Sequence, residues 1–523
     1  MKRLAATMMA GLAGLAAVAA PVSGSKPRLV VGIVVDQLRT DYVEQLRNLF
    51  GEKGFNTFMR DGQYMRDVDF GSAGLDVASG TAEVLTGSWP AYTGVPGAMV
   101  YDSETSMMRP VLAAPSATGS YSNNSFSPEG LRLSTIADEM AIASDGKAQI
   151  YSVAADPQQA VILAGHAANG AVWVNNTSGL WATGSYYGAL PSVAQKANVR
   201  GALTHRVDTM QWRPLAATTR YIQAGTGRAP QFSYKFARND RDLYRKAVLT
   251  PGGNAAVTDM AVDLIGMLSP DASRPGMVNI GYTVAPYRFA NGDAEAETTD
   301  AYLRLDAQIG RIIDAVDRYC GRENAVIWIT STGYYEAAAT EDKKYRLPGG
   351  EFSARRAKSL LNSYLTARHG SADYVAAIRN GNIYLDNKAI EARNLSPEAV
   401  ADEARQFVAR MSGVERTFTR AEILSATNPT TLALNRSYDP KTGADILIQL
   451  APGWSMADDE SAISTHNKPM RQMPVMTPAF ILAPAVKAQT VSTPVDATAI
   501  APTVAGILRI RSPNGARTRP LSF

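Results

Sequence analysis

The sequence predicts an α/β fold, with a mostly parallel central sheet flanked by helices and a small α+β insertion. A continuous apolar run at 28–35 (RLVVGIVV) is rich in β-branched residues, which is typical of a strand buried on both faces of a parallel sheet. Similar short runs recur along the chain, and helical segments separate them. Strands that alternate with helices are typical of βαβ units, which build parallel sheets.

The remaining elements follow from the same patterns. Further buried parallel strands are expected at 149–155, 277–283, 325–330 and 478–483. Helices are expected at 130–142, 255–267, 298–319 and 498–508. Ligand sites of such folds lie beyond the carboxyl ends of the strands, so Asp36, directly after the first strand, is the first candidate site residue.

The stretch 371–450 departs from this alternation. Short strands at 382–385 and 445–450 enclose a helix at 397–411, which predicts a small α+β subdomain. We therefore expect 20–370 and 451–523 to form the main domain, with 371–450 as the inserted subdomain.

Composition excludes several kinds of protein and site. The chain has 523 residues, of which 46% are hydrophobic, enough for a large core. Its 52 basic and 48 acidic residues nearly balance, so no nucleic-acid partner is expected. The single cysteine excludes an intramolecular disulfide and a cysteine-based zinc site. A histidine-rich metal site is difficult to build from four histidines: His166, His205, His369 and His466.

The first residues have the pattern of a secretory signal peptide. A basic start at Lys2 and Arg3 precedes an apolar, alanine-rich run at 4–20, and Ala17-Val18-Ala19 offers small residues for cleavage. This predicts a signal peptide at 1–19 and a periplasmic or secreted protein, with a membrane anchor as the alternative. No later stretch approaches the ~20 apolar residues of a membrane span, so no transmembrane segment is expected after cleavage.

Several stretches together resemble a known family. They are LVVGIVVDQLRTDY (29–42), LTGSWPAYTGV (85–95), ILAGHAANGAVW (162–173), LTPGGN (249–254), TDAYLRLDAQI (299–309), ISTHNKP (463–469) and ATAIAPTVAGIL (497–508). The chain resembles the alkaline phosphatase superfamily, in the branch of phosphate-irrepressible phosphatases related to type I phosphodiesterases and nucleotide pyrophosphatases. The resemblance spans nearly the whole mature chain and implies an alkaline-phosphatase-like fold. The stretch 371–450 also resembles an insertion of that branch.

The resemblance implies where the chemical groups of the family should stand. Members hydrolyse phosphate esters with two zinc ions and a threonine or serine nucleophile. Of the six ligand positions, Asp36 is kept, and the other five fall on Thr283, Tyr287, Thr332, Gly333 and Met476. The nucleophile position falls on Val77, which has no oxygen. The phosphate-contacting positions fall on Ala98, Asp156 and Gln158.

These substitutions favour an exported pseudoenzyme with neither a catalytic residue nor a cofactor. Its role would then be binding in the cell envelope, to a protein partner or to a small ligand in the remodelled cleft. The alternative is a metal-dependent phosphomonoesterase or phosphodiesterase with an altered metal site, which would require two zinc ions. A purely structural envelope protein is a third hypothesis that the sequence does not separate from the first.

Three further hypotheses concern residues near these positions. Ser79 or Thr81 is either a displaced nucleophile or an ordinary helix-start hydroxyl. An all-oxygen site for Ca²⁺ or Mg²⁺ could use Asp36, Asp76 and Glu83. A cluster of tyrosines either fills the vacated zinc volume or lines an apolar pocket: Tyr287, Tyr334 and Tyr335. His166 and His466 match structural histidines of the family.

Overall fold

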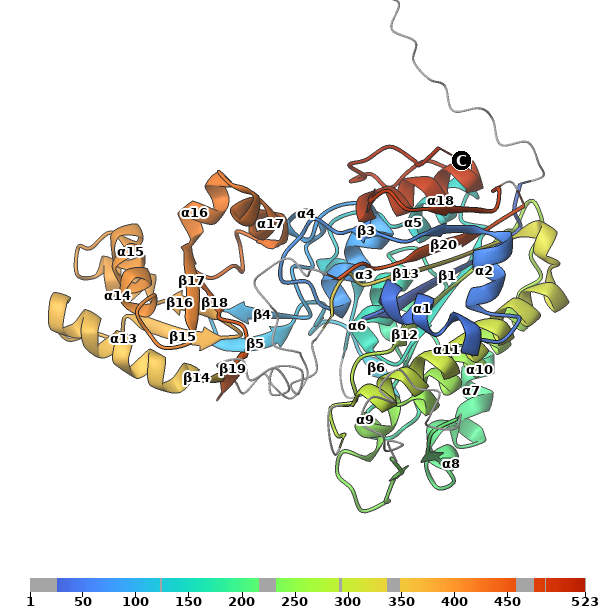
Figure 1. Cartoon of the computed structure of the whole chain (residues 1–523), viewed down its shortest axis with the longest axis horizontal. Helices are drawn as coiled ribbons and strands as arrows, with labels where there is room; N and C mark the ends of the chain where they lie inside the picture. The colour runs from blue at the N-terminus through green and yellow to red at the C-terminus, as the bar shows by residue number, and fades with distance from the viewer. Residues whose placement is uncertain are drawn as a thin grey trace, which may run out of the picture.

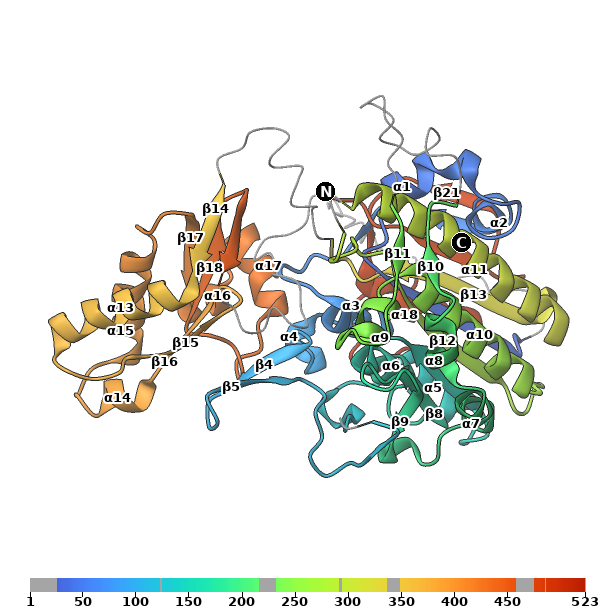
Figure 2. The same ribbon diagram turned by 90° about the horizontal axis from the view of Figure 1, so that it is seen from below.

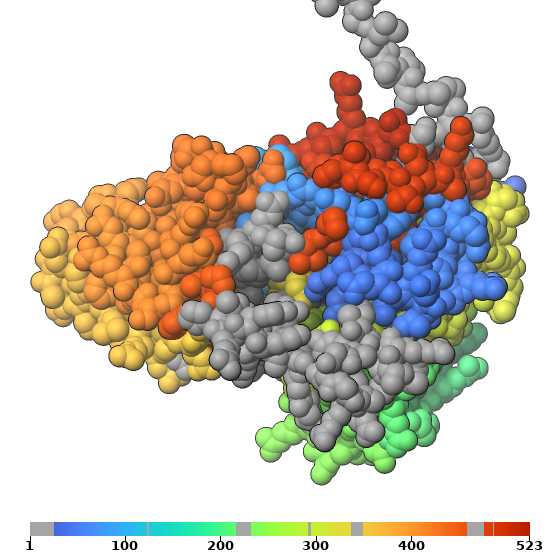
Figure 3. Space-filling model, viewed as in Figure 1, coloured from blue at the N-terminus to red at the C-terminus, as the bar shows by residue number. Residues whose placement is uncertain are grey.

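A larger α/β body and a smaller lobe beside it make up the computed structural model (Figures 1 and 3). It describes residues 26–122, 125–215, 232–290, 294–335, 349–457, 475–484 and 486–522. The predicted signal peptide at 1–19 and His466 lie outside the described residues. In the part of the chain that is described, no helix is long and apolar enough to cross a membrane.

Parallel strands form the centre of the main sheet, as the apolar runs predict. The described strands follow the order β21-β2-β20-β13-β1-β12-β7-β8-β9-β6. The parallel centre comprises β13 (Ala325–Ser331), β1 (Leu29–Asp36), β12 (Gly276–Thr283), β7 (Gln149–Ala154) and β8 (Gly170–Val174). The outer strands are β21 (Gln489–Val491), β2 (Gln63–Met65), β20 (Ala479–Leu482), β9 (Trp181–Gly184) and β6 (Gly119–Ser120). The predicted fold class is confirmed.

The prediction for 478–483 is right about a strand but wrong about its direction. β20 pairs antiparallel with both β13 and β2. Its four residues are all buried, and a continuous apolar run predicts burial but not strand direction. Direction depends on the path of the connecting chain, and an antiparallel strand beside a parallel sheet is common.

Helices cover both faces of the sheet because side chains alternate along each strand. Every second residue of β1, from Leu29 to Val35, packs into one apolar cluster, while Val30 and Val34 pack into the other. The first cluster includes α10 (Pro251–Met267) and α11 (Glu295–Tyr319), which lie side by side in Figure 2. The second includes α3 (Val77–Thr86), α5 (Ile136–Ala143), α6 (Pro157–Ala164) and α18 (Ile500–Leu508).

The smaller lobe is an antiparallel sheet with helices packed on it (Figure 1). The sheet order is β15 (Val375–Arg379), β16 (Asn382–Leu385), β18 (Ile446–Leu450) and β17 (Val414–Thr419). The helix predicted at 397–411 is α15 (Pro397–Val408). The same apolar core also includes residues of α13 (Ala354–His369), and Met456 of β19 (Trp454–Ala457) packs against it, so residues beyond both ends of 371–450 contribute to the lobe.

Contacts at its base attach this lobe to the main body. Tyr101 of β4 (Met99–Asp102) stacks on Tyr384 with ring centroids 4.1 Å apart. Arg132 donates to the buried carboxylate of Asp439 at 2.8 Å. The segment that carries Ala98 is therefore held close to the lobe.

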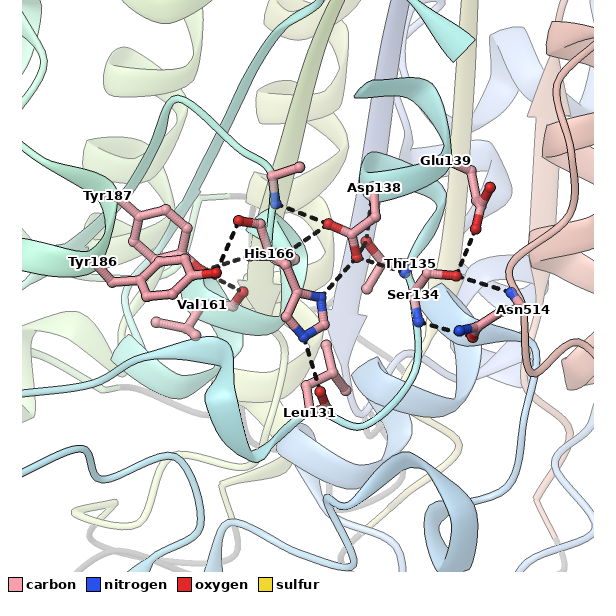
Figure 4. A network of polar contacts seen from close by, with 12 residues as sticks. Leu131, Ser134, Thr135, Asp138, Glu139, Val161, His166, Tyr186, Tyr187 and Asn514 are labelled. Atoms are coloured by element: carbon pink, nitrogen blue, oxygen red, sulfur yellow. Dashed lines mark hydrogen bonds and ion pairs between the residues drawn. The ribbon is translucent and has the colours of Figure 1, made fainter. Parts of the chain in front are cut away.

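His166 stabilises the framework through a polar network (Figure 4). Its Nδ1 lies 3.0 Å from Asp138 Oδ2, and its Nε2 lies 2.9 Å from the Leu131 carbonyl. The hydrogen bond with Asp138 raises the pKa of His166, although burial opposes this. Burial disfavours ionisation of Asp138, but hydrogen bonds from His166 and from backbone amides outweigh it and lower the pKa of Asp138. A structural role for this histidine fits these contacts.

Candidate functional site

Asp36 lies at the carboxyl end of the central strand, where β12 and β13 end beside it. Its side chain is buried, with the residue 6% exposed. Thr332 Oγ1 donates to Oδ1 at 3.1 Å, and Thr283 Oγ1 donates to Oδ2 at 3.4 Å. The strand register explains this meeting, since Asp36 pairs with Thr283 and Val35 pairs with Ser331. Three of the six predicted ligand positions therefore meet, but as a carboxylate hydrogen-bonded by two hydroxyls.

The fourth ligand position is Gly333, and the Phe70 ring occupies the space that a side chain at this position would need. Gly333 has a φ of +69°, and a Cβ added to it would lie 2.3 Å from the Phe70 ring. A histidine here would need both a strained backbone and a displaced ring. Sequence reasoning missed Phe70, because nothing in the local pattern at 70 or 333 indicates that these segments touch.

The last two ligand positions make other contacts. Tyr287 packs edge-on against Trp212 and Tyr234, with centroid distances of 5.1 and 4.9 Å, and burial raises its pKa to about 12. Met476 is 45% exposed, and its carbonyl accepts from the Thr40 amide. Tyr334 is also buried, whereas Tyr335 is partly exposed and its ring lies 3.9 Å from the Arg39 guanidinium, so the three tyrosines do not share one environment.

The predicted nucleophile position, Val77, is the first residue of α3. The preceding Asp76 caps this helix, accepting from the Ser79 amide at 3.0 Å and from the Ala98 amide at 2.8 Å. Ser79 Oγ donates to Asp76 Oδ1 at 2.9 Å, and Thr81 Oγ1 donates to the Val77 carbonyl at 2.6 Å. Both hydroxyls hold the start of the helix, so the capping interpretation agrees with the structure.

Two of the three phosphate-contacting positions, Ala98 and Gln158, are hydrogen-bonded to each other. Gln158 Nε2 donates to the Ala98 carbonyl at 2.9 Å, and Gln158 Oε1 accepts from the Leu112 amide at 3.1 Å. Asp156 caps α6 by accepting from the Gln159 amide at 2.7 Å. Burial, reinforced by the nearby charges of Asp36 and Asp76, raises the pKa of Asp156 to about 6. This neighbourhood is negatively charged above that pH.

Glu83, in the middle of α3, is fully buried. Neither carboxyl oxygen has a hydrogen-bond partner, and desolvation raises its pKa well above the usual range. The charged groups that influence it are Asp496, Arg436 and Asp69. Across the described ranges, no group of three or more histidine, cysteine or acidic side chains could hold a metal ion. The hypothetical all-oxygen site of Asp36, Asp76 and Glu83 is therefore not formed.

Gly80 allows α3 to pack closely against the chain at the end of β13. A Cβ added to Gly80 would lie 1.9 Å from the Thr332 carbonyl oxygen, so only hydrogen fits there. This close approach keeps the start of α3, with Val77 and Asp76, beside the Thr332–Asp36 hydrogen bond. The contact joins segments far apart in the chain, and no sequence pattern predicted it.

Comparison with known proteins identifies related chains. A family model described as type I phosphodiesterase / nucleotide pyrophosphatase matches residues 30–469. Alkaline phosphatase PafA of Elizabethkingia meningoseptica is 25% identical over 520 residues, covering 95% of this chain and 94% of the relative. Alkaline phosphatase PhoV of Synechococcus elongatus is 22% identical over 523 residues, covering 95% and 92%.

The fold comparison agrees with the sequence comparison. The crystal structure of PafA aligns with a TM-score of 0.83 at 24% identity, covering 95% of this chain and 98% of the other. A PafA variant with a threonine, an asparagine, a lysine and an arginine replaced aligns with the same TM-score at 23% identity. The alkaline-phosphatase-like fold expected from the resemblance is confirmed.

Glu83→Gln is expected to raise the free energy of unfolding increasingly as pH rises above about 4.5. The carboxyl is protonated in the folded chain but ionises in the unfolded chain above its usual pKa. The wild type therefore loses stability with rising pH, by up to about 1.4 kcal/mol per unit until the folded-state pKa is reached, whereas the amide does not titrate. Urea unfolding at pH 5 and pH 7.5 measures the difference.

The matched control is Glu129→Gln, which makes the same chemical change at an exposed position. A pH-independent difference for Glu83→Gln would contradict the assignment of a neutral buried carboxyl.

Gly80→Ala is expected to lower the free energy of unfolding by about 1–3 kcal/mol, the usual effect of overpacking. The added methyl would meet backbone, which cannot rotate away. Gly506→Ala in α18 is the control, because its Cβ would have only a 3.9 Å neighbour. That change should stabilise by about 0.5–1 kcal/mol through helix propensity. If the two changes alter the free energy of unfolding equally in denaturant, Gly80 does not pack against the Thr332 carbonyl.

Proposed function

The chain belongs to the type I phosphodiesterase / nucleotide pyrophosphatase family of the alkaline phosphatase superfamily, and from that premise we propose that it is an exported pseudoenzyme. In this proposal the two-zinc site and the nucleophile are lost. The remaining role is binding in the cell envelope, to a protein partner or to a small ligand in the remodelled cleft.

One observation carries the proposal: Thr332 and Thr283 donate to the two carboxylate oxygens of Asp36. Zinc in proteins takes cysteine, histidine and carboxylate ligands, and a threonine hydroxyl is not among them. The donor set does not fit a zinc pair, since the other three positions hold a glycine, a phenol and a thioether: Gly333, Tyr287 and Met476. These residues therefore support no catalytic step through a metal.

The electrostatics and the hydroxyls near α3 also support the proposal. Val77 cannot attack phosphorus, and Ser79 and Thr81 donate within their own helix. Asp156 stands where the family places a cation, and its charge adds to those of Asp36 and Asp76 above pH of about 6. Such a site repels a phosphoryl dianion.

The spacing of the four residues replaced in the PafA variant supports the alignment of positions. Its threonine and asparagine are separated by as many residues as Val77 and Ala98. Its lysine and arginine are separated by as many residues as Asp156 and Gln158. A shift of register at these segments is thus a poor explanation for the missing groups.

The second candidate is a metal-dependent phosphomonoesterase or phosphodiesterase with an altered site. The names of the relatives favour it, since PafA and PhoV are alkaline phosphatases. It requires a nucleophile and metal ligands at positions other than those that the family uses.

A phosphatase assay with the variant Asp36→Ala separates the two candidates. We expect purified protein supplied with zinc to hydrolyse p-nitrophenyl phosphate no faster than an equally purified Asp36→Ala variant. Any residual rate then comes from a contaminant, and it should be the same in both preparations. Turnover that disappears with Asp36→Ala would overturn the pseudoenzyme proposal, and a matched Asp145→Asn variant at an exposed turn controls for preparation.

A further inference from the structure

An aromatic surface lies where the smaller lobe meets the main body. There α17 (Pro429–Ser437) of the lobe packs beside α4 (Pro90–Thr93) of the body (Figure 1). Trp89, directly before α4, and Tyr92 within it place their ring centroids 6.4 Å apart. Tyr92 is 44% exposed. Because one exposed tyrosine is ordinary on a protein surface, the charges around it decide what this surface can bind.

Two arginine side chains stack on these rings. The guanidinium carbon of Arg517, in the C-terminal segment, lies 3.7 Å from the Tyr92 ring centroid and 4.9 Å from that of Trp89. Arg436, in α17, lies over the Trp89 ring at 4.2 Å, so the two arginines share one ring. Stacking on aromatic faces holds each guanidinium in place and leaves the N–H groups at its edge to meet a ligand.

The chain leaves the charge of both arginines without a counter-charge. Arg436 donates to the Gly71 carbonyl at 3.0 Å, and Arg517 Nε donates to Ser88 Oγ at 3.4 Å. Both acceptors are uncharged, and within the described ranges neither arginine forms an ion pair with a carboxylate. Glu83 feels the charge of Arg436, but burial keeps its carboxyl protonated. The surface is therefore cationic.

The same stack holds two donors that have no acceptor. Arg436 Nε and Trp89 Nε1 are both buried, and neither has a hydrogen-bond partner. Buried polar groups are normally hydrogen-bonded, so this stack contains more donors than the described chain satisfies. Carboxylates form strong hydrogen bonds with a guanidinium, often two at once. The surplus of donors and the positive charge both favour a ligand that carries carboxylates.

An apolar side chain extends the surface on the side of the lobe. Leu432 lies four residues before Arg436 on α17, so the two side chains share one face of the helix. Leu432 is 40% exposed. A ligand that reached both arginines would thus also meet exposed apolar groups of Leu432 and Tyr92. A free inorganic anion cannot use those groups, whereas a peptide with acidic and apolar side chains can.

We infer that this surface binds an acidic segment of a partner protein, in which glutamate or aspartate alternates with apolar residues. The carboxylates pair with Arg517 and Arg436, and an apolar side chain packs on Tyr92 and Leu432. The inference rests on the proposed function, because it gives the binding role proposed there a surface and a partner of stated chemistry.

Isothermal titration calorimetry with the blocked peptide acetyl-Leu-Glu-Phe-Glu-Leu-amide tests the inference. In an extended peptide the two glutamates point to the same side. We expect the wild-type chain to bind this peptide and to bind the glutamine analogue, acetyl-Leu-Gln-Phe-Gln-Leu-amide, roughly tenfold more weakly or worse. Added salt should weaken binding of the glutamate peptide, because it screens exposed charges.

The variant Arg517→Gln removes one charge from the surface. Its side chain is exposed, so the change leaves the core intact, and we expect it to weaken binding of the glutamate peptide by roughly tenfold. The matched control is Arg355→Gln, which makes the same change at an exposed position of α13 in the smaller lobe. This control should bind the peptide as the wild type does.

Three results would overturn the inference: no binding of the glutamate peptide, equal binding of the glutamine analogue, or unchanged binding by Arg517→Gln. Inorganic phosphate that displaces the peptide at equal concentration would indicate a simple anion site and would also overturn it. Zinc-dependent phosphatase turnover in a chain that binds the peptide would contradict the proposed function alone. A chain with neither turnover nor peptide binding would contradict this inference alone.

Discussion

A buried carboxylate at the end of the central strand must be satisfied, and this constraint shapes the altered site. Asp36 lies between β12 and β13, where water is largely excluded. An uncompensated charge there would cost several kcal/mol. The hydroxyls of Thr283 and Thr332 supply the donors, one from each neighbouring strand. A carboxylate that serves a metal in the family can thus remain as a structural group.

The surrounding packing follows from that arrangement. Gly80 allows α3 to rest against the Thr332 carbonyl, and Gly333 leaves room for the Phe70 ring. The Asp76 side chain accepts a hydrogen bond from the Ala98 amide, and the Gln158 side chain donates one to the Ala98 carbonyl. The segments that would grip a phosphate in the family are joined by hydrogen bonds among themselves. These hydrogen bonds fix the positions of the loop ends relative to one another.

The sequence predicted the fold better than it predicted the site. Buried strands at 28–35 and 277–283 are continuous apolar runs, so their positions follow from composition alone. The direction of β20 and the packing of α13 with the smaller lobe depend on chain paths that local patterns do not record. The convergence of Thr283 and Thr332 on Asp36 was predictable from the family register.

Contacts between distant segments were beyond sequence reasoning. Nothing near Phe70 indicates Gly333, and nothing near Glu83 indicates a fully buried carboxyl without partners. Tyr287 was expected beside the vacated zinc volume, yet its partners Trp212 and Tyr234 come from two short antiparallel strands that no sequence pattern indicated. Such contacts depend on tertiary packing, in which side chains meet through the folded path of the chain.

Metal content tests the central claim most directly, because it does not depend on choosing a substrate. Mature protein purified without chelator and without a metal-affinity step can be measured by elemental mass spectrometry. The account predicts zinc well below about one equivalent per chain, since one retained carboxylate cannot replace the three ligands that each zinc needs. Zinc near about two equivalents per chain, as in a two-metal hydrolase, would contradict it and make the phosphatase the preferred candidate.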